Sequence, residues 1–294
     1  MYQKPPWIKS KIPSGDNYLR LKSLFRSLGL NTVCEEALCP NIAECWGSGT
    51  ATIMILGDTC TRACKFCNVK HGFPKGFVDE YEPTRVALAL KQMNLNYIVI
   101  TSVDRDDLED GGASIFAKTI REIKNRCKDI LIEVLIPDFC GDLEALRKVV
   151  KEEPNVIAHN IETVKSLTSK VRDPRANYYQ SLSVLKNVKK LNSKIYTKSS
   201  IMLGLGEKEE EVIKTMKDLR EANVDFLTLG QYLRPTKRHL EVKEYIHPSK
   251  FDEYKKIAEE LGFLYVASGP LVRSSYKAGE FYIKNLLHKN VVID

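Results

Sequence analysis

Long apolar runs are absent from this sequence of 294 residues. No stretch approaches the ~18 consecutive apolar residues of a membrane span, so we expect no membrane association. The apolar core of a secretory signal peptide is also missing from the first residues, MYQKPPWIKSKIPSGD. We therefore expect a protein of a reducing compartment, with a cytoplasmic location, in which clustered cysteines serve metal or redox chemistry rather than disulfides.

Zinc-finger spacing and the interleaving of aromatic with basic residues are absent too, and aromatic residues make up only 9% of the chain. Their absence argues against a basic protein that binds nucleic acid through zinc. The hydrophobic content of 43% and the charged content of 28% are typical of a globular protein rather than a disordered one. The length permits one large domain or two small ones.

The net charge of +7 is concentrated in one region. Residues 165–200 contain nine basic side chains and one acidic side chain, and the basic ones include Lys186, Lys189, Lys190 and Lys194. Two interpretations stay open. The region is either a solvated face near the C-terminus of a helix expected over 178–191, or an electrostatic landing patch for an acidic partner domain.

Short apolar runs alternate with helical patterns from residue 52 onward. The apolar runs cover 52–56, 97–101, 130–136, 156–159, 195–203, 226–230 and 264–267. The helical patterns cover 84–93, 112–126, 142–151, 178–191, 207–221 and 248–261. Strands that alternate with helices of this length predict βαβ units and a parallel sheet. We predict an α/β fold, a partial TIM-type (β/α)6 barrel with N-terminal and C-terminal extensions; a doubly wound open sheet is the structural alternative.

Three parts are expected along the chain. Residues 1–50 form an N-terminal extension with little strand signal, 51–245 form the barrel, and 246–294 form a C-terminal extension. In a parallel barrel the loops after the strands meet at one face, where active sites lie. Polar residues follow most of the expected strands. Glu133 lies inside an apolar run, so its carboxylate must be paired or face this site.

The eight cysteines are unevenly distributed. Cys127 and Cys140 stand alone and are expected to be small buried core residues. The other six form two triplets, and the second triplet, Cys60-x3-Cys64-x2-Cys67, is the most specific signal in the sequence.

The second triplet places three thiols on one loop. Three thiolates can hold three irons of a 4Fe–4S cluster and leave the fourth iron open to another ligand. A zinc ion, which would normally require a fourth protein ligand, and three buried structural thiols are the alternatives. Phe66 precedes the last cysteine, where an aromatic ring can pack beside a molecule on the open iron.

The spacing of this triplet, on a loop after the first barrel strand, resembles the radical S-adenosylmethionine superfamily. The resemblance implies that the open iron binds the methionine amino and carboxylate groups, and that an electron then releases a 5′-deoxyadenosyl radical. No side-chain acid or base is expected to carry such a reaction. The cofactor-binding residues that we expect are Phe66, Thr101, Ser102, Asn160, Glu162 and Arg172.

These cofactor-binding assignments keep plainer alternatives. Thr101 and Ser102 lie where members of the superfamily bind the methionine amino group. Asn160 and Glu162 bind ribose or carboxylate, or else they only cap a loop. Arg172, like Arg234, holds a carboxylate or pairs with nearby acids.

A first triplet, Cys34-x4-Cys39-x5-Cys45, lies upstream of the barrel. It indicates another cluster with a non-cysteine ligand, for which a structural or electron-relay role is the alternative. Together with matching stretches over residues 4–276, this triplet gives the chain a resemblance to the lipoyl synthase family. The matching stretches are KPPWIK, CEEALCPNIAECW, CTRACKFCNV, ITSVDRDDLEDGGA, IEVLIPDF, HNIETV, GLGE, LTLGQYLRPT and VASGPLVRSSY.

The resemblance to lipoyl synthases implies that the first triplet and one serine of RSSY hold an auxiliary 4Fe–4S cluster that serves as the sulfur source. We choose Ser275 over Ser274 as that serine. A hard alkoxide among soft thiolates should be the ligand most easily lost as the cluster is dismantled. The alternative is that Ser275 is the N-cap of a helix expected over 276–287. The expected metal ligands are Cys34, Cys39, Cys45, Ser275, Cys60, Cys64 and Cys67.

The implied reaction inserts two sulfur atoms at carbons 6 and 8 of an octanoyl chain that is bound to a lysine of a carrier domain. The implied partners are octanoylated carrier domains of 2-oxo acid dehydrogenase E2 subunits and of the glycine cleavage H protein, an electron donor such as ferredoxin or flavodoxin, and iron–sulfur carrier proteins. The functional alternatives are another sulfur-inserting enzyme of the superfamily, biotin synthase-like or thioether-forming, and a non-catalytic two-cluster electron carrier.

Overall fold

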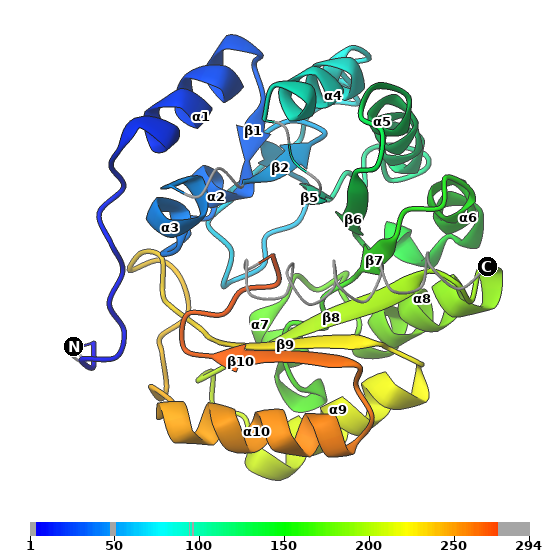
Figure 1. Cartoon of the computed structure of the whole chain (residues 1–294). Helices are drawn as coiled ribbons and strands as arrows, with labels where there is room; N and C mark the ends of the chain where they lie inside the picture. Colours follow the sequence, from blue (N-terminus) through cyan, green and yellow to red (C-terminus); the bar gives the residue numbers. More distant parts are fainter. Residues whose placement is uncertain (1–3, 48–50, 94, 96, 276–294) are drawn as a thin grey trace.

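The computed structural model describes residues 4–47, 51–93, 95 and 97–275. Within these residues the main feature is an eight-stranded sheet that curves into an open barrel (Figure 1). Across the sheet, the strands are β1 (Asn31–Thr32), β2 (Thr52–Ile55), β5 (Tyr97–Ser102), β6 (Leu131–Leu135), β7 (Val156–Ala158), β8 (Tyr196–Leu203), β9 (Phe226–Gln231) and β10 (Tyr265–Gly269). All neighbours from β2 to β10 pair in parallel, and β1 pairs antiparallel with β2.

Helices cover the outer face of the sheet (Figure 1). They are α4 (Glu82–Met93), α5 (Ala113–Arg126), α6 (Leu143–Lys151), α8 (Tyr178–Leu191), α9 (Glu209–Glu221) and α10 (Pro248–Glu260). Apolar side chains of β2, β5 and β6 share one core with α4, α5 and α6, and those of β8 and β9 share a second core with α9 and α10. This burial on one side of each strand fixes which side chains point into the barrel.

The inner face follows from the alternation of side chains along the strands. Ile98 and Ile100 of β5 pack on the helices, so Tyr97 and Thr101 point inward. Near the amino ends of the strands, the interior holds a buried ion pair in which Lys198 Nζ lies 2.8 Å from Glu133 Oε1. The hydroxyl of Tyr97 donates to Glu133 Oε2 at 2.5 Å. Glu133 is therefore paired, as its position required, and does not line the cavity described below.

Shorter elements join these strands and helices. They are α1 (Asp16–Ser27), α2 (Val33–Glu36), α3 (Ile42–Gly47), the 3-10 helices η1 (Phe139–Gly141) and η2 (Lys165–Leu167), α7 (Thr168–Val171), and the small sheet of β3 (Thr59–Cys60) and β4 (Lys70–His71). The helix α1 packs on α3, with the rings of Phe25 and Trp46 5.6 Å apart. These contacts hold the N-terminal segment beside the edge of the barrel formed by β1 and β2 (Figure 1).

The predicted partial barrel is confirmed, and the seven expected strands each lie within two residues of their predicted bounds. The helix α9 begins at Glu209 rather than at residue 207, because the carboxylate of Glu207 accepts the amides of Gly204 and Leu205 and closes the preceding loop. Residues 1–50 contribute β1, although little strand signal is expected there. The division at residues 50 and 245 stays a prediction, since the sheet includes strands from both sides of each boundary. No helix of the described part is long and apolar enough to cross a membrane.

Candidate active site

One large cavity lies at the carboxyl ends of the parallel strands. Its volume is about 1370 Å³, which exceeds the ~300–1,000 Å³ of an ordinary small-molecule pocket. All six clustered cysteines and Ser275 line it, as do the six residues expected to bind the cofactor. The structure therefore brings every predicted site residue to one place, and the space exceeds what one small molecule requires.

The second cysteine triplet lies on the loop that follows β2, and backbone amides point at its sulfur atoms. Cys60 Sγ accepts from the amide of Arg62 at 3.4 Å and from that of Asp104 at 3.3 Å. Cys64 Sγ accepts from the amide of Asp173 at 3.3 Å. Hydrogen bonds to cluster sulfur atoms help to set the reduction potential, so these contacts suit cluster ligands.

The protonation of these three thiols depends on what they bind. Burial raises the pKa of Cys60 and of Cys64 to about 12, and Asp104 adds to the effect on both. Burial raises the pKa of Cys67 to about 11. Iron must therefore displace the protons of the three thiols when it binds.

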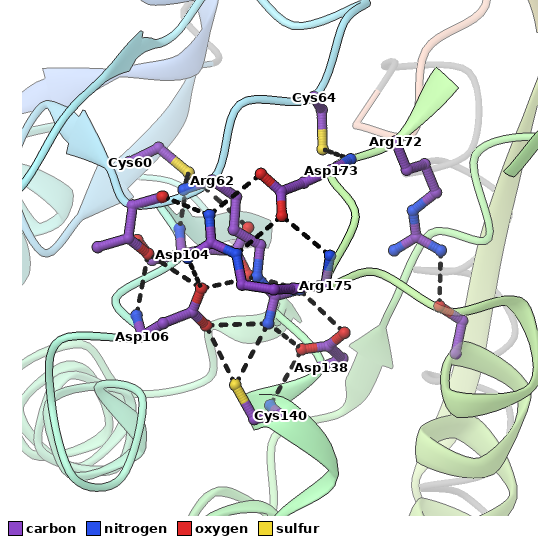
Figure 2. A network of polar contacts seen from close by, with 12 residues as sticks. Cys60, Arg62, Cys64, Asp104, Asp106, Asp138, Cys140, Arg172, Asp173 and Arg175 are labelled. Atoms are coloured by element: carbon purple, nitrogen blue, oxygen red, sulfur yellow. Dashed lines mark hydrogen bonds and ion pairs between the residues drawn. The ribbon is translucent and has the colours of Figure 1, made fainter. Parts of the chain in front are cut away.

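A buried arginine inside the triplet fastens this loop to the sheet (Figure 2). The guanidinium of Arg62 donates two hydrogen bonds to Asp138, at 2.9 and 2.6 Å, and two to Asp106, both at 2.9 Å. Asp138 follows β6 and Asp106 follows β5, so one side chain ties the loop to two strand ends. Burial alone would raise the pKa of Asp138, but Arg62 holds it at about 2.

A second pair fastens the other side of the same loop (Figure 2). Asp173, after α7, accepts the amide of Ala63 at 2.8 Å and is bound by Arg175 Nε at 2.8 Å. Arg175 also donates to the carbonyl of Thr61 at 2.7 Å. Our sequence reasoning missed Asp138 and Asp173, as well as the two arginines. The available signal was the run of acids after the strands, which includes Asp104 and Asp106.

The first cysteine triplet faces the same cavity from the N-terminal segment. Cys34 lies in α2 and Cys45 in α3, and the amide of Cys39 donates to the carbonyl of Cys34 at 3.0 Å. Burial raises the pKa of Cys34 to about 11.

The C-terminal segment reaches the first triplet from the other end of the chain. The side chain of Asn41 donates to the carbonyl of Leu271 at 2.7 Å. Arg273, Ser274 and Ser275 follow and line the cavity together with the triplet. The expected helix over 276–287 lies outside the described residues, so its alternative role for Ser275 as an N-cap stays a prediction.

Three of the six residues expected to bind the cofactor have buried polar atoms without protein partners. In the described part of the chain, Ser102 Oγ, Asn160 Oδ1 and Arg172 Nε are buried and accept or donate no hydrogen bond. Such atoms are costly to bury unless a ligand satisfies them. The amide nitrogen of Asn160 donates to Glu162 Oε1 at 3.1 Å, and Thr101 donates to the carbonyl of Leu135 at 3.1 Å. These unsatisfied atoms, together with the thiol donors, fit a polar ligand held beside an iron–sulfur cluster.

Other predicted residues have other partners. Phe66 packs with Tyr232 against Val171 and Leu205. Arg234 lines the cavity, but its Nε donates to the carbonyl of Thr236 at 3.1 Å, and its nearest carboxylate is Glu241 at 3.8 Å. Among the described residues, no three His, Cys, Asp or Glu side chains converge closely enough for a single metal ion.

The core assignment is wrong for Cys140 and holds in part for Cys127, which packs against the main core. Cys140 is exposed, because residues 139–141 have φ angles of 47°, 52° and 81° that turn it outward, and its thiol donates to Asp106 Oδ1 at 3.2 Å. Cys127 is half-buried at the end of α5. His159 has a structural role, since its ring nitrogens bind the Ile136 carbonyl and the Ser181 hydroxyl, both at 2.9 Å.

Four of the nine basic side chains in the region over 165–200 are buried or paired with acids. Arg172 and Lys198 are buried, Arg175 pairs with Asp173 and Asp106, and Lys189 lies 2.6 Å from Asp225 Oδ2. The exposed basic side chains that remain include Lys186 and Lys190 on α8 and Lys194 in the turn before β8. The C-terminus of α8 leads to the amino end of β8, opposite the cavity. A partner that serves the cavity therefore gains little from a landing patch there.

Comparisons with known proteins agree with this site. A model of the radical SAM superfamily matches residues 54–219, and a model of the N-terminal domain of lipoyl synthase matches residues 2–39. Two solved structures share the fold at low sequence identity. Methylornithine synthase has a TM-score of 0.51 and 14% identity over 90% of this chain and 81% of its own. Coproporphyrinogen III oxidase from Escherichia coli has a TM-score of 0.55 and 16% identity over 71% of this chain and 52% of its own.

Curated relatives are far more similar in sequence. The Homo sapiens protein "Lipoyl synthase, mitochondrial" is 58% identical over 295 residues, which cover 99% of this chain and 79% of the human one. The protein of the same name from Schizosaccharomyces pombe is 58% identical over 97% of this chain and 77% of its own. These names overturn the expected cytoplasmic location, which was inferred only from a missing apolar core near residue 1. The chain belongs to the lipoyl synthase family of the radical SAM superfamily.

Proposed function

We propose that the two triplets hold two separate clusters with different tasks in one cavity. Membership of the family implies a 4Fe–4S cluster with S-adenosylmethionine and a second cluster. In our assignment, Cys60, Cys64 and Cys67 hold the first of these and leave one iron open. The second is held by Cys34, Cys39, Cys45 and Ser275. The observation that carries the assignment is that all seven ligands line a single cavity although they come from three distant segments.

The chemistry of the bound groups is radical chemistry: the open cluster and S-adenosylmethionine supply a carbon-centred radical, and the second cluster supplies sulfur. The protein's own residues bind, orient and exclude water. Arg172 offers positive charge to the methionine carboxylate, while Ser102 Oγ and Asn160 Oδ1 offer hydrogen bonds to its polar groups. Phe66 and Tyr232 form an apolar wall that keeps water from the same region.

The protein-bound octanoyl chain requires apolar walls next to both clusters. Met54, Leu135 and Met202 provide such walls at the carboxyl ends of three strands. An alkyl chain that lies between the two triplets meets a hydrogen-abstracting group from one side and a sulfur donor from the other. Proximity of this kind replaces acid–base catalysis, and we assign no general acid or base.

The partners follow from this chemistry. Lipoyl synthases act on lipoyl carrier domains, and we propose that this chain accepts octanoylated domains of 2-oxo acid dehydrogenase E2 subunits and of the glycine cleavage H protein. Each radical requires an electron, which a ferredoxin or a flavodoxin supplies. A cluster consumed as sulfur source must be rebuilt, which requires iron–sulfur carrier proteins. The biotin-like, thioether-forming and electron-carrier alternatives are not retained, because the curated relatives are lipoyl synthases.

The assignment of ligands is tested by metal analysis after anaerobic reconstitution. Replacing all three cysteines of either triplet with alanine should remove about half of the bound iron and sulfide, and the two variants should differ in their electron paramagnetic resonance signals. Only the variant that lacks Cys34, Cys39 and Cys45 should keep the spectral change on adding S-adenosylmethionine. Equal iron content in wild type and either variant would refute the assignment.

The choice between the two serines is tested with a matched pair. Ser275→Ala should lower the iron held at the first triplet, whereas Ser274→Ala should not, because both residues line the cavity but only one is assigned as ligand. The reverse result would transfer the role to Ser274.

A further inference from the structure

The mouth of the cavity carries charge of one sign. Of the described residues that line the cavity, the exposed ones include five cations and no carboxylate. We call these five the basic mouth, and they are Lys4, Lys65, Lys70, Lys237 and Arg238. The acids that line the cavity, which are Asp104, Asp138 and Glu162, are buried or half-buried.

Most of this positive charge is not neutralised by the protein. Lys70 faces Asp58 at 3.5 Å, across an exposed pair. For Lys237 and Arg238, no carboxylate of the described part lies within ion-pair distance, and neither side chain donates a hydrogen bond there. Their charges are free to attract an anionic partner, because exposed and unpaired cations raise the local positive potential.

The loop that presents Lys237 and Arg238 is held next to the second cysteine triplet. His239 Nε2 hydrogen-bonds the carbonyl of Cys67 at 2.9 Å, and the amide of Leu240 donates to the carbonyl of Lys65 at 3.2 Å. Arg234 bonds the carbonyl of Lys237 across the turn. The loop that carries the two unpaired cations is therefore held at the entrance, beside the loop of the second triplet.

We propose that the basic mouth is the docking surface for a negatively charged face of the acyl-bearing carrier domain. The inference rests on the proposed function, in which the substrate is an octanoyl chain attached to a folded protein. The chain must enter the cavity while its carrier stays outside, so the carrier contacts the residues around the entrance. Complementary charge there speeds encounter and fixes orientation, and it is weakened by salt. Leu38, exposed by 58% at the same entrance, offers an apolar contact beside the charges.

The lysines of α8 provide a matched control. Lys186 and Lys190 are also exposed and unpaired by any carboxylate of the described residues, but they lie on the outer helix layer away from the cavity. The variants Lys237→Glu/Arg238→Glu and Lys186→Glu/Lys190→Glu change the net charge equally. None of the four residues is a cluster ligand or a cofactor contact, so both variants keep the reacting groups.

The test compares the two variants on two substrates at two salt concentrations. The substrates are an octanoylated carrier domain of negative net charge and an uncharged octanoyl-lysine peptide. At low salt, the mouth variant should lose about tenfold in kcat/KM on the carrier domain and much of its salt dependence. The α8 variant should stay within about twofold of wild type, and both should turn over the peptide as wild type does.

Three outcomes would overturn the proposal. Equal loss on the carrier domain and the peptide would show that the loop was displaced, which thermal unfolding of the variants checks independently. Equal loss in the two variants would show a general charge effect. Unchanged carrier kinetics, with loss of binding to an RNA oligonucleotide, would assign the mouth to nucleic acid. Failure of the proposed function itself is distinct, because wild type would then not convert the peptide.

Discussion

The side-chain amide of Asn41 donates a 2.7 Å hydrogen bond to the carbonyl oxygen of Leu271, although the two residues are 230 positions apart. Asn41 follows Cys39 closely, and Leu271 precedes Ser275 closely. This half-buried contact therefore joins the segment with the first triplet to the segment with the serine assigned as its fourth ligand. The site is assembled from both ends of the described chain.

Removing that bond should loosen the first-triplet site selectively. Asn41→Ala leaves the Leu271 carbonyl without its partner and should lower the free energy of unfolding by about 1–3 kcal/mol. Iron at the first triplet should fall while iron at the second stays. Asn17→Ala is the control, because Asn17 makes a similar bond to the carbonyl of Gly47 without touching the C-terminal segment. Equal iron loss in both variants would contradict the tether.

The C-terminal segment also requires the small size of one glycine. A methyl group on Gly230, at the end of β9, would lie 2.1 Å from the carbonyl oxygen of Val272, whereas one on Gly269 would lie 3.4 Å from a flexible Val272 methyl. Gly230→Ala should displace the segment, cost about 1–3 kcal/mol and reduce iron at the first triplet. Gly269→Ala should have little effect. Thermal unfolding and iron analysis of the two variants check this difference.

The anchor of the second triplet should dominate the stability of the cluster-free protein. Arg62→Met leaves the buried carboxylate of Asp138 unpaired and should lower the free energy of unfolding by about 3–5 kcal/mol. Arg62→Lys keeps the positive charge but cannot bond both carboxylates as the planar guanidinium does. Its free energy of unfolding should therefore lie between those of wild type and Arg62→Met.

A double variant separates the pair from the individual residues. Arg62→Met combined with Asp138→Leu should recover part of the loss, as a urea-unfolding double-mutant cycle measures. If the losses in free energy of unfolding of the two single variants simply add up in the double variant, Arg62 and Asp138 are not directly coupled.

His159 should make stability depend on pH. Burial, assisted by Arg172, lowers the pKa of His159 to about 4, while Asp138 and the Ile136 carbonyl act in the opposite direction. The unfolded chain, with a histidine pKa near ~6.5, binds the proton more readily than the folded chain. The contribution of His159 to the free energy of unfolding is therefore fully present above about pH 6.5. It falls by up to about 3 kcal/mol as the pH drops to 4.

The contribution of His159 is isolated by difference. In urea unfolding between pH 4 and 7, His159→Asn should show a shallower fall than wild type, because asparagine does not titrate. Parallel curves for the two proteins would show that other groups cause the dependence.

The fold could be predicted from the sequence because its signals are local. Runs such as 97–101 and 226–230 carry their own periodicity, and parallel strands place the ends of these runs at one face regardless of detail. The cysteine triplets are local too, so their spacing alone indicated clusters. The resemblance to lipoyl synthases then added Ser275, which no local pattern marks.

The missed features depend on contacts between distant segments. Arg62 meets Asp138 across 76 residues, and Lys189 meets Asp225 from another element. Nothing in the sequence shows such pairings, so the basic region over 165–200 was assigned more free charge than it has. Cys140 was misplaced because the sequence does not reveal that a non-glycine residue there adopts a positive φ.

The separate tasks of the two triplets are tested most directly by measuring radical formation and sulfur insertion in the same reaction. Reconstituted wild type, Cys34→Ala and Cys64→Ala are each incubated anaerobically with S-adenosylmethionine, a reductant and an octanoyl-lysine peptide. Wild type should form 5′-deoxyadenosine and add two sulfur atoms to the peptide. Cys34→Ala should form 5′-deoxyadenosine without adding sulfur, and Cys64→Ala should do neither. Sulfur insertion by Cys34→Ala would contradict the assignment of separate tasks to the two triplets.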